Sequence, residues 1–286
     1  MCGDYEYHNG FLDIDGWDIA HLRRVSWLWS SLDKPRVFDT YTLNQGDTTQ
    51  LLPNTDKTFA LRQWIEEFPL EIKGGDVTLP VLPKSSDLTL SLGDACNSLY
   101  DSGLSSKSIS HRWSQISDLA ELARWYERHA DQVSEAETVT HLIVPLLSAL
   151  GWSPQSLAVE WPITGTGTAD LVAFRPLRGR LRTDADISVL VEAKRLGTSC
   201  LTAVDQARRY AAKMENCLRL VVTDGMRYAI FVRASNNKGF GNTPVAYLNL
   251  LEPRKSYPIL CCEGAGEALV SLSSAWHLGS IEGPGS

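Results

Sequence analysis

Three charged side chains stand where strands would normally carry apolar ones. Asp170 lies near the start of the apolar segment ADLVAF, and Glu192 and Lys194 lie two residues apart at the end of ISVLVEAK. Successive side chains of a strand point to opposite faces, so Glu192 and Lys194 share a face. Burying a carboxylate and an ammonium there is costly unless a partner offsets their charge. A divalent cation such as Mg²⁺, which commonly takes one or two carboxylates, would do so.

The pair Asp170 and Glu192 therefore predicts a magnesium site. Lys194 would hold or activate an attacking water beside it and offset the charge of a phosphate. The alternative is an ordinary salt bridge at a strand edge, because an isolated E-x-K sequence is common.

Two helices are expected to bring further polar side chains to this place. Ser134 to Glu137 has the form of a capping box, and Glu135 precedes Val139 and Leu142 by four and seven residues, so it faces the sheet. Glu137 points away and serves as the partner of the cap. In the following helix Gln206 and Tyr210 are four residues apart and share a face, where they could bind a phosphate or brace Lys194, or simply lie on the surface.

The elements that position these residues alternate between helix and strand. Apolar periodicity predicts a helix over 134–150, bent at Pro145, and the second half of the chain then continues with further elements. We expect strands at 156–163, 169–174 and 187–194, a helix at 201–215, strands at 218–225, 227–234 and 245–251, and a closing helix at 266–276. This order predicts an α/β domain around one sheet.

The first part of the chain reads as a separate α+β region of unknown role. Short strands are expected at 41–43, 77–82 and 88–92, and a helix at 59–68. A Ser- and Gly-rich stretch, 101–110, reads as a linker, and a helix follows it at 117–129. We therefore expect one domain over 1–115 and a second over 116–286.

Charge is unevenly distributed along the chain. Of 34 acidic and 27 basic side chains, residues 1–130 hold 19 and 12 and residues 131–286 hold 15 of each, so the net charge of −7 belongs to the first part. This balance argues against a protein that simply coats nucleic acid. The 43% hydrophobic content also excludes a disordered or fibrous chain.

A basic stretch nevertheless lies in the second half. Residues 175–219 hold ten basic and five acidic side chains, which predicts a surface that contacts phosphates, with a mixed-charge solvated surface as the alternative. The side chains expected to contact DNA are Arg175, Arg178, Arg180, Arg182, Arg195, Arg208 and Arg209.

The location expected for this chain is the cytoplasm. Its six cysteines form no CxxC pair, no apolar signal segment follows the acidic start, and no apolar run approaches the ~18–20 residues that span a bilayer. We expect no membrane partner.

Together, these residues resemble the PD-(D/E)XK nuclease superfamily. The matching segments are Glu135, PLLSALGW, TAD at 168–170, VLVEAK at 189–194, DQARRYA and LVVTDGMRYAIF. Within the superfamily the chain is most similar to the nuclease domain at the N-terminus of type I restriction enzyme motor subunits. The resemblance covers residues 131–276, with Ala169 where the family name has proline.

The resemblance implies a restriction-endonuclease-like core, a mixed central sheet flanked by helices, and a Mg²⁺-dependent DNA endonuclease of restriction or antiviral defence, with Mn²⁺ as a substitute metal. Asp170, Glu192 and Lys194 would form its catalytic core, with the carbonyl of Ala193 as a further metal ligand. Glu135 would be the helix glutamate, and Gln206 and Tyr210 the family's Q-x-x-x-Y feature.

Partners are less constrained than the site. The sequence contains no G-x-x-x-x-G-K-[ST] loop, so we expect a nuclease that stands alone, forms a homodimer, or works with a separate motor or specificity protein. The competing interpretation is a non-catalytic protein that binds nucleic acid or docks a partner and retains the nuclease fold.

Overall fold

The computed structural model describes the backbone of residues 2–7 and 21–25, together with residues 88–175, 181–234, 239–258 and 260–281. Contacts divide the chain into two compact units, Met1–His8 with His21–Val81, and Asn9–Ala20 with Leu82–Ser286. In the first unit β1 (Cys2–Tyr7) pairs antiparallel with β2 (His21–Val25). The strands and helix expected at 41–43, 59–68 and 77–82 lie outside the described residues.

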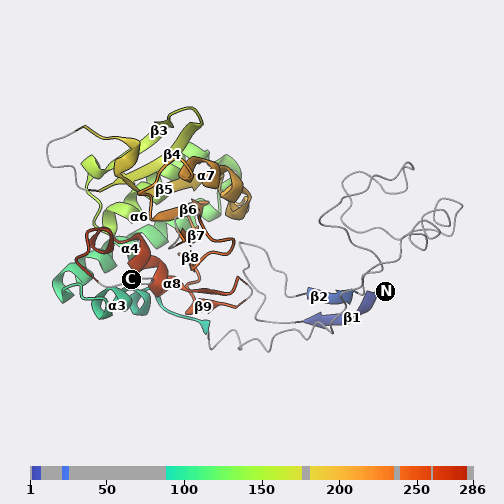
Figure 1. Ribbon diagram of the computed structural model, residues 1–286. Coiled ribbons are helices and arrows are strands. Elements are labelled where there is room, and N and C mark those ends of the chain that lie inside the picture. Colours follow the sequence, from blue (N-terminus) through green and yellow to red (C-terminus); the bar gives the residue numbers. More distant parts are fainter. Residues whose placement is uncertain are drawn as a thin grey trace, which may run out of the picture. The chain divides into compact units, whose positions relative to one another are not determined.

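One mixed sheet of eight strands organises the second unit (Figure 1). Its order is β3-β4-β5-β6-β7-β8-β10-β9, in which β5–β6 and β8–β10 pair in parallel and the other neighbours pair antiparallel. The strands are β3 (Leu157–Ile163), β4 (Gly167–Phe174), β5 (Ile187–Ala193), β6 (Arg219–Thr223), β7 (Arg227–Val232), β8 (Ala246–Asn249), β9 (Ser256–Tyr257) and β10 (Cys262–Glu263). An α/β class with a mixed sheet was predicted, and the structure confirms it.

Helices cover both faces of this sheet, because the strands are apolar on both sides. Val189 and Val191 of β5 face the larger core, to which α3, α4, α6 and α8 contribute, while Leu190 faces the core that contains Ala207 and Ala211 of α7. The helices are α3 (Leu92–Asp101), α4 (Ser106–Glu127), α5 (Glu135–Thr138), α6 (Val144–Ala149), α7 (Val204–Ala211), α8 (Ala265–Leu272) and α9 (Ser274–His277). The alternation of strand side chains therefore produces a helix–sheet–helix arrangement.

The helix expected over 134–150 is present, with one irregular turn. Ser134 caps α5, and a π-helical turn at Val139–Ile143 joins α5 to α6. Pro145 lies in the first turn of α6, where its missing N–H and its ring disturb the regular hydrogen-bond pattern of the preceding turn. The irregularity expected at this proline therefore takes the form of a widened turn.

The part of the chain before residue 116 departs from expectation. Within 88–92, Thr89 alone makes a strand-like bridge, which pairs it with Arg254. Helix α3 begins at Leu92, so the strand predicted over 88–92 is wrong. The stretch 101–110 contains the end of α3 and the start of α4, which Ser105 caps. The boundary expected at 115 falls within α4, and both helices pack on the larger core.

None of the helices within the described ranges is both long and apolar enough to cross a lipid bilayer.

Candidate active site

Asp170 and Glu192 lie side by side on neighbouring strands. The antiparallel register pairs Val172 with Leu190 and Leu171 with Val191, so one further step places Asp170 opposite Glu192. Asp170 Oδ2 accepts a hydrogen bond of 2.6 Å from the backbone N–H of Ala193. The carboxylate of β4 thus contacts the backbone of β5 at the end of the paired region.

Lys194 completes a compact charged group with these two carboxylates. Its Nζ lies 3.7 Å from Glu192 Oε1, and the side chains of Lys194 and Glu192 are 23% and 1% exposed. The second oxygen, Glu192 Oε2, is buried and accepts no hydrogen bond from any described residue. A buried carboxylate oxygen without a hydrogen-bond partner is costly, and a cation is a group that such an oxygen can bind.

Glu135 reaches the same group from the start of α5. Ser134 and Glu137 form the expected capping box, in which the Ser134 backbone N–H donates to Glu137 Oε2 at 2.9 Å. Glu135 is therefore left free of the cap and half-buried. Burial raises the pKa of Glu135; the charge of Lys194 opposes this rise, Asp170 adds to it, and a backbone hydrogen bond from Arg195 also opposes it.

The grouping of three carboxylates raises their proton affinity. Burial, followed by the charge of Asp170, raises the pKa of Glu192 to about 7; Lys194 opposes the shift and Glu135 adds to it. Burial likewise raises the pKa of Asp170, against the effects of the Ala193 N–H and of Lys194. A cation bound beside these oxygens would favour their ionised forms.

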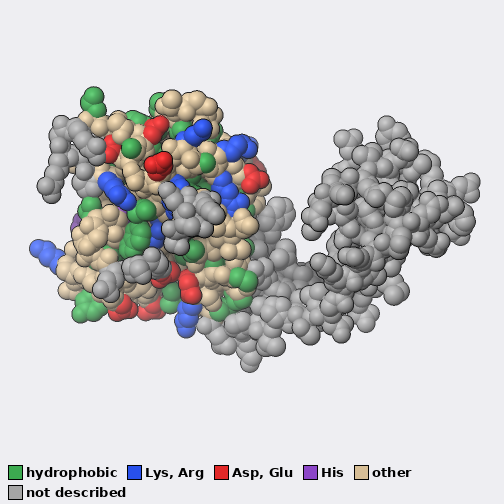
Figure 2. All heavy atoms as spheres, viewed as in Figure 1, with side chains coloured by type: hydrophobic (Ala, Val, Ile, Leu, Met, Phe, Trp, Pro, Cys, Tyr) green, Lys and Arg blue, Asp and Glu red, His purple; other side chains and the backbone are tan. Residues whose placement is uncertain are grey.

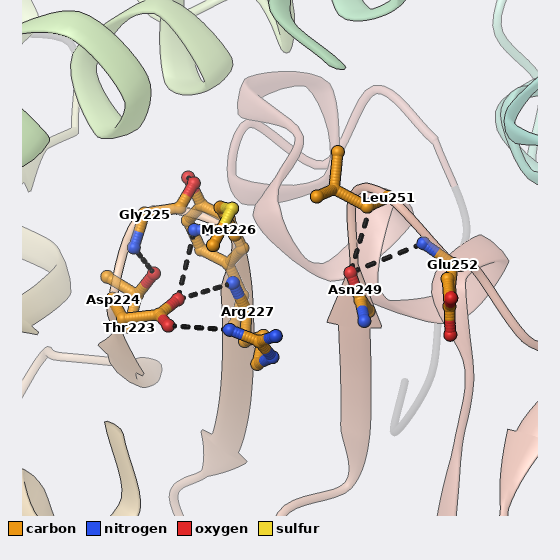
Figure 3. Close-up of polar contacts among 9 residues, drawn as sticks. Thr223, Asp224, Gly225, Met226, Arg227, Asn249, Leu251 and Glu252 are labelled. Atoms are coloured by element: carbon orange, nitrogen blue, oxygen red, sulfur yellow. Dashed lines mark hydrogen bonds and ion pairs between the residues drawn. The ribbon is translucent and has the colours of Figure 1, made fainter. Parts of the chain in front are cut away.

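The β6–β7 turn, whose internal hydrogen bonds Figure 3 shows, contacts both Lys194 and the helix that begins at Glu135. Lys194 N–H donates to the carbonyl of Thr223 at 2.8 Å, and buried Asp224 accepts from the backbone N–H groups of Met226 and Arg227 at 3.0 and 2.7 Å. Gly225 follows with φ +87°, and a β-carbon there would lie 2.5 Å from the Thr138 methyl. The turn therefore packs directly against the helix that begins with Glu135.

Gln206 and Tyr210 form a pair of their own. Gln206 Nε2 donates to the Tyr210 hydroxyl at 3.3 Å, and that hydroxyl lies 2.8 Å from where a β-carbon on Gly167 would stand. The pair thus lies against the start of β4. Within the described part of the chain, neither side chain hydrogen-bonds Asp170 or Glu192.

The arginines expected to contact DNA have different surroundings. Arg182 donates to the carbonyls of Leu157 and Gln155, and Arg208 donates to the carbonyl of Gly241, so both tie parts of the fold together. Arg195 is exposed and donates to the carbonyl of Asp131.

Two more of these arginines are exposed to solvent, as Arg195 is, and two lie outside the described residues. Arg175 and Arg209 are exposed, and Arg178 and Arg180 belong to the range that is not described. Figure 2 shows basic and acidic side chains interspersed on one face of the molecule. On that face, phosphate contacts would come from individual cations rather than from one continuous basic surface.

Two contributors to the site were not anticipated from the sequence. The Asp224–Gly225 pair was predicted as a hairpin turn, but nothing in the sequence indicates that Gly225 contacts α5. Glu160 of β3 lies close enough to raise the pKa of Asp170 by its charge. Glu160 is the one charged residue of the otherwise apolar segment LAVEWPI, which is the same kind of signal that singled out Asp170.

The donor set fits Mg²⁺ better than a metal held by many side chains. Among the described residues, no three His, Cys, Asp or Glu side chains are grouped closely enough to hold a metal ion. Mg²⁺ needs fewer, since it is usually bound by one or two carboxylates together with waters and substrate phosphates. Asp170 and the unpartnered oxygen of Glu192 meet that requirement.

Comparisons with protein-family models, with curated proteins and with solved structures found no match for this chain.

Proposed function

We propose that this chain is a Mg²⁺-dependent DNA endonuclease with a PD-(D/E)XK core, acting in restriction or defence against foreign DNA. One observation carries the proposal. Glu192 is buried at the end of an apolar strand with one oxygen unpartnered among the described residues, while Asp170 and Lys194 lie beside it. A structural salt bridge would not require a second carboxylate in the same place.

The residues divide the chemistry between them. Asp170, Glu192 and the carbonyl of Ala193 would hold the cation, which supplies charge for the phosphate and acidity to a water. Lys194 positions that water for in-line attack on phosphorus. The new P–O bond forms as the bridging P–O bond breaks. Glu135, which retains some proton affinity, accepts a proton from the attacking water, and solvent protonates the leaving oxygen.

Gln206 and Tyr210 support this arrangement from the side of the sheet that α7 covers. Tyr210, which accepts a hydrogen bond from Gln206, lies against Gly167 and braces the start of β4, which carries Asp170 three residues later. The exposed guanidinium groups of Arg175 and Arg209 are the best placed of the described arginines to contact the DNA backbone.

The number of sites limits what the chain can cut alone. One such site hydrolyses one strand, so double-strand cleavage requires a homodimer, two sequential nicks, or a separate motor or specificity protein that presents the DNA.

Cleavage assays test this proposal. The purified protein is incubated with supercoiled, linear and single-stranded DNA and with RNA, in Mg²⁺, Mn²⁺ or EDTA. We expect nicking of DNA that EDTA abolishes and that Glu192→Ala and Lys194→Ala each reduce by at least about a hundredfold. Glu215→Ala, at an exposed glutamate beyond α7, is the matched control. Cleavage that persists in either site variant would refute the assigned site, whereas binding without cleavage by the wild type would favour the non-catalytic interpretation.

A further inference from the structure

Glu160 occupies an unusual position beside the candidate active site. The β3–β4 register pairs Val159 with Leu171 and Trp161 with Ala169, which places Glu160 opposite Asp170. Since Asp170 is in turn opposite Glu192, three acidic residues occupy matching positions in one row across β3, β4 and β5. Glu160 is the exposed end of this row and Glu192 the buried end.

The backbone at Glu160 is in the left-handed region, with φ +52° in the middle of a strand. As a result, the side chains of β3 switch from one face of the sheet to the other at this residue. Ala158 and Trp161, three residues apart, both pack against the core on the α7 side, which strict alternation would not allow. Glycine would adopt this backbone without strain, so the presence of a glutamate calls for another reason.

Among the described residues, Glu160 has no basic partner to explain its charge. None of the salt bridges among the described residues involves Glu160, and the nearby Lys194 is paired with Glu192. Its carboxylate does act on Asp170, whose pKa it raises. The row therefore concentrates negative charge at one end of the strands while Glu192 Oε2 lacks a partner within the described chain.

We propose that Glu160 is a further carboxylate of this site, which strengthens the binding of a divalent cation at Asp170 and Glu192 through its charge. This inference rests on the proposed function. Because the described residues contain no cluster of three side chains at ligand distance, Glu160 acts through the solvent around the cation rather than as a direct ligand. Its carboxylate is near enough to Asp170 to act on it by charge.

Coulomb's law gives the expected effect. Neighbouring strands are about 5 Å apart, so a carboxylate of β3 lies roughly 6 Å from a cation bound at Asp170. A single negative charge and a doubly positive ion at that distance, screened as in water, give about a tenfold contribution to affinity. Salt should weaken this contribution, because the carboxylate is exposed.

The experiment measures Mn²⁺ binding without DNA, by electron paramagnetic resonance of the free ion. It compares the wild type with Glu160→Gln, Glu160→Gly and Glu192→Gln, and Glu215→Gln is the control for loss of an exposed charge. We expect about tenfold weaker Mn²⁺ binding in both Glu160 variants, a smaller difference at 0.5 M salt, and unchanged binding in the control. Glu192→Gln should lose nearly all binding.

The outcomes distinguish the inference about Glu160 from the proposed metal site at Asp170 and Glu192. Glu192→Gln could lose Mn²⁺ binding while both Glu160 variants bind Mn²⁺ as the wild type does. Glu160 would then have no part in metal binding, so the inference would be wrong, and the proposed metal site would be supported. A loss in Glu160→Gly alone would mean that the strand geometry, not the charge, matters, and would also overturn the inference. If the wild type binds no Mn²⁺, both proposals fail together.

Discussion

Glu192→Gln should make the metal-free protein more stable at alkaline pH. Burial and the neighbouring carboxylates raise the pKa of Glu192 from 4.5 to about 7. Between these values the native state binds a proton that the unfolded chain has released, so the free energy of unfolding falls as the pH rises through this window. Above pH 7 the whole penalty is present, and a neutral isostere would remove it.

The size of the effect follows from the shift. About 2.5 pKa units at 1.36 kcal/mol each give ~3 kcal/mol at pH 8. The variant loses the contact with Lys194 and buries an amide that needs partners, which reduces the net gain to about 1–2 kcal/mol. For a domain of this size that corresponds to a rise in Tm of roughly 2–8 °C.

The assay is thermal and urea unfolding in EDTA at pH 5 and pH 8, with Glu215→Gln as the control for loss of an exposed carboxylate. Glu192→Gln should gain stability at pH 8 and little at pH 5, where wild-type Glu192 is already protonated. Saturating Mg²⁺ should then stabilise the wild type, by about 2.7 kcal/mol at a hundred times its Kd, and leave the variant unchanged. Equal stability at pH 8, or the same gain at both pH values, would refute this reasoning.

Three further predictions concern a turn beside the site, a buried histidine and two arginines. Gly225→Ala should lower stability by about 2–4 kcal/mol in urea unfolding, because its new methyl would lie 2.5 Å from Thr138 in a left-handed turn. His277 is buried between Ser188 and the Ser271 carbonyl, and burial lowers its pKa to about 3. The unfolded chain therefore binds a proton that the native state excludes, and wild-type stability should fall more steeply from pH 6 to pH 4 than that of His277→Asn. Arg182→Ala should cost about 2 kcal/mol of stability through its lost carbonyl contacts, whereas Arg175→Ala should leave stability unchanged and lower the salt slope of DNA binding by about 1.

The sheet and its helices were largely predictable because burial on both faces leaves a strong pattern. The strand over 187–193 is apolar at nearly every position, and the stripe from Val139 to Leu150 has a helical period. Charged residues that interrupt such segments stand out, which is why Asp170, Glu192 and Lys194 could be selected without a structure. Strand geometry alone predicted that Glu192 and Lys194 share a face, whereas the placement of Asp170 opposite Glu192 depends on the register of β4 and β5.

The region before residue 116 was harder to predict because its signals are local and ambiguous. Serines favour both loops and helix N-caps, and Ser105 proves to be the cap of a 22-residue helix. A capping serine and a linker serine look alike unless an apolar stripe follows, and in α4 the buried residues begin with Ile109 and continue only at Ile116. The contact of α3 with α8, far along the chain, then decides that this segment joins the larger core.

The site's least predictable feature is a backbone angle. Glu192 and Glu160 both interrupt apolar segments and are visible in the sequence, whereas the left-handed backbone at Glu160 is not. Glu160 stands opposite Asp170, which accepts a hydrogen bond from the Ala193 N–H, so the left-handed backbone lies where three strands meet. A periodicity analysis reads each strand separately, so it cannot register a conflict that exists only when the two are paired. Both conflicts meet in the Glu160–Asp170–Glu192 row, and a cation bound there would offset the charge of both end residues.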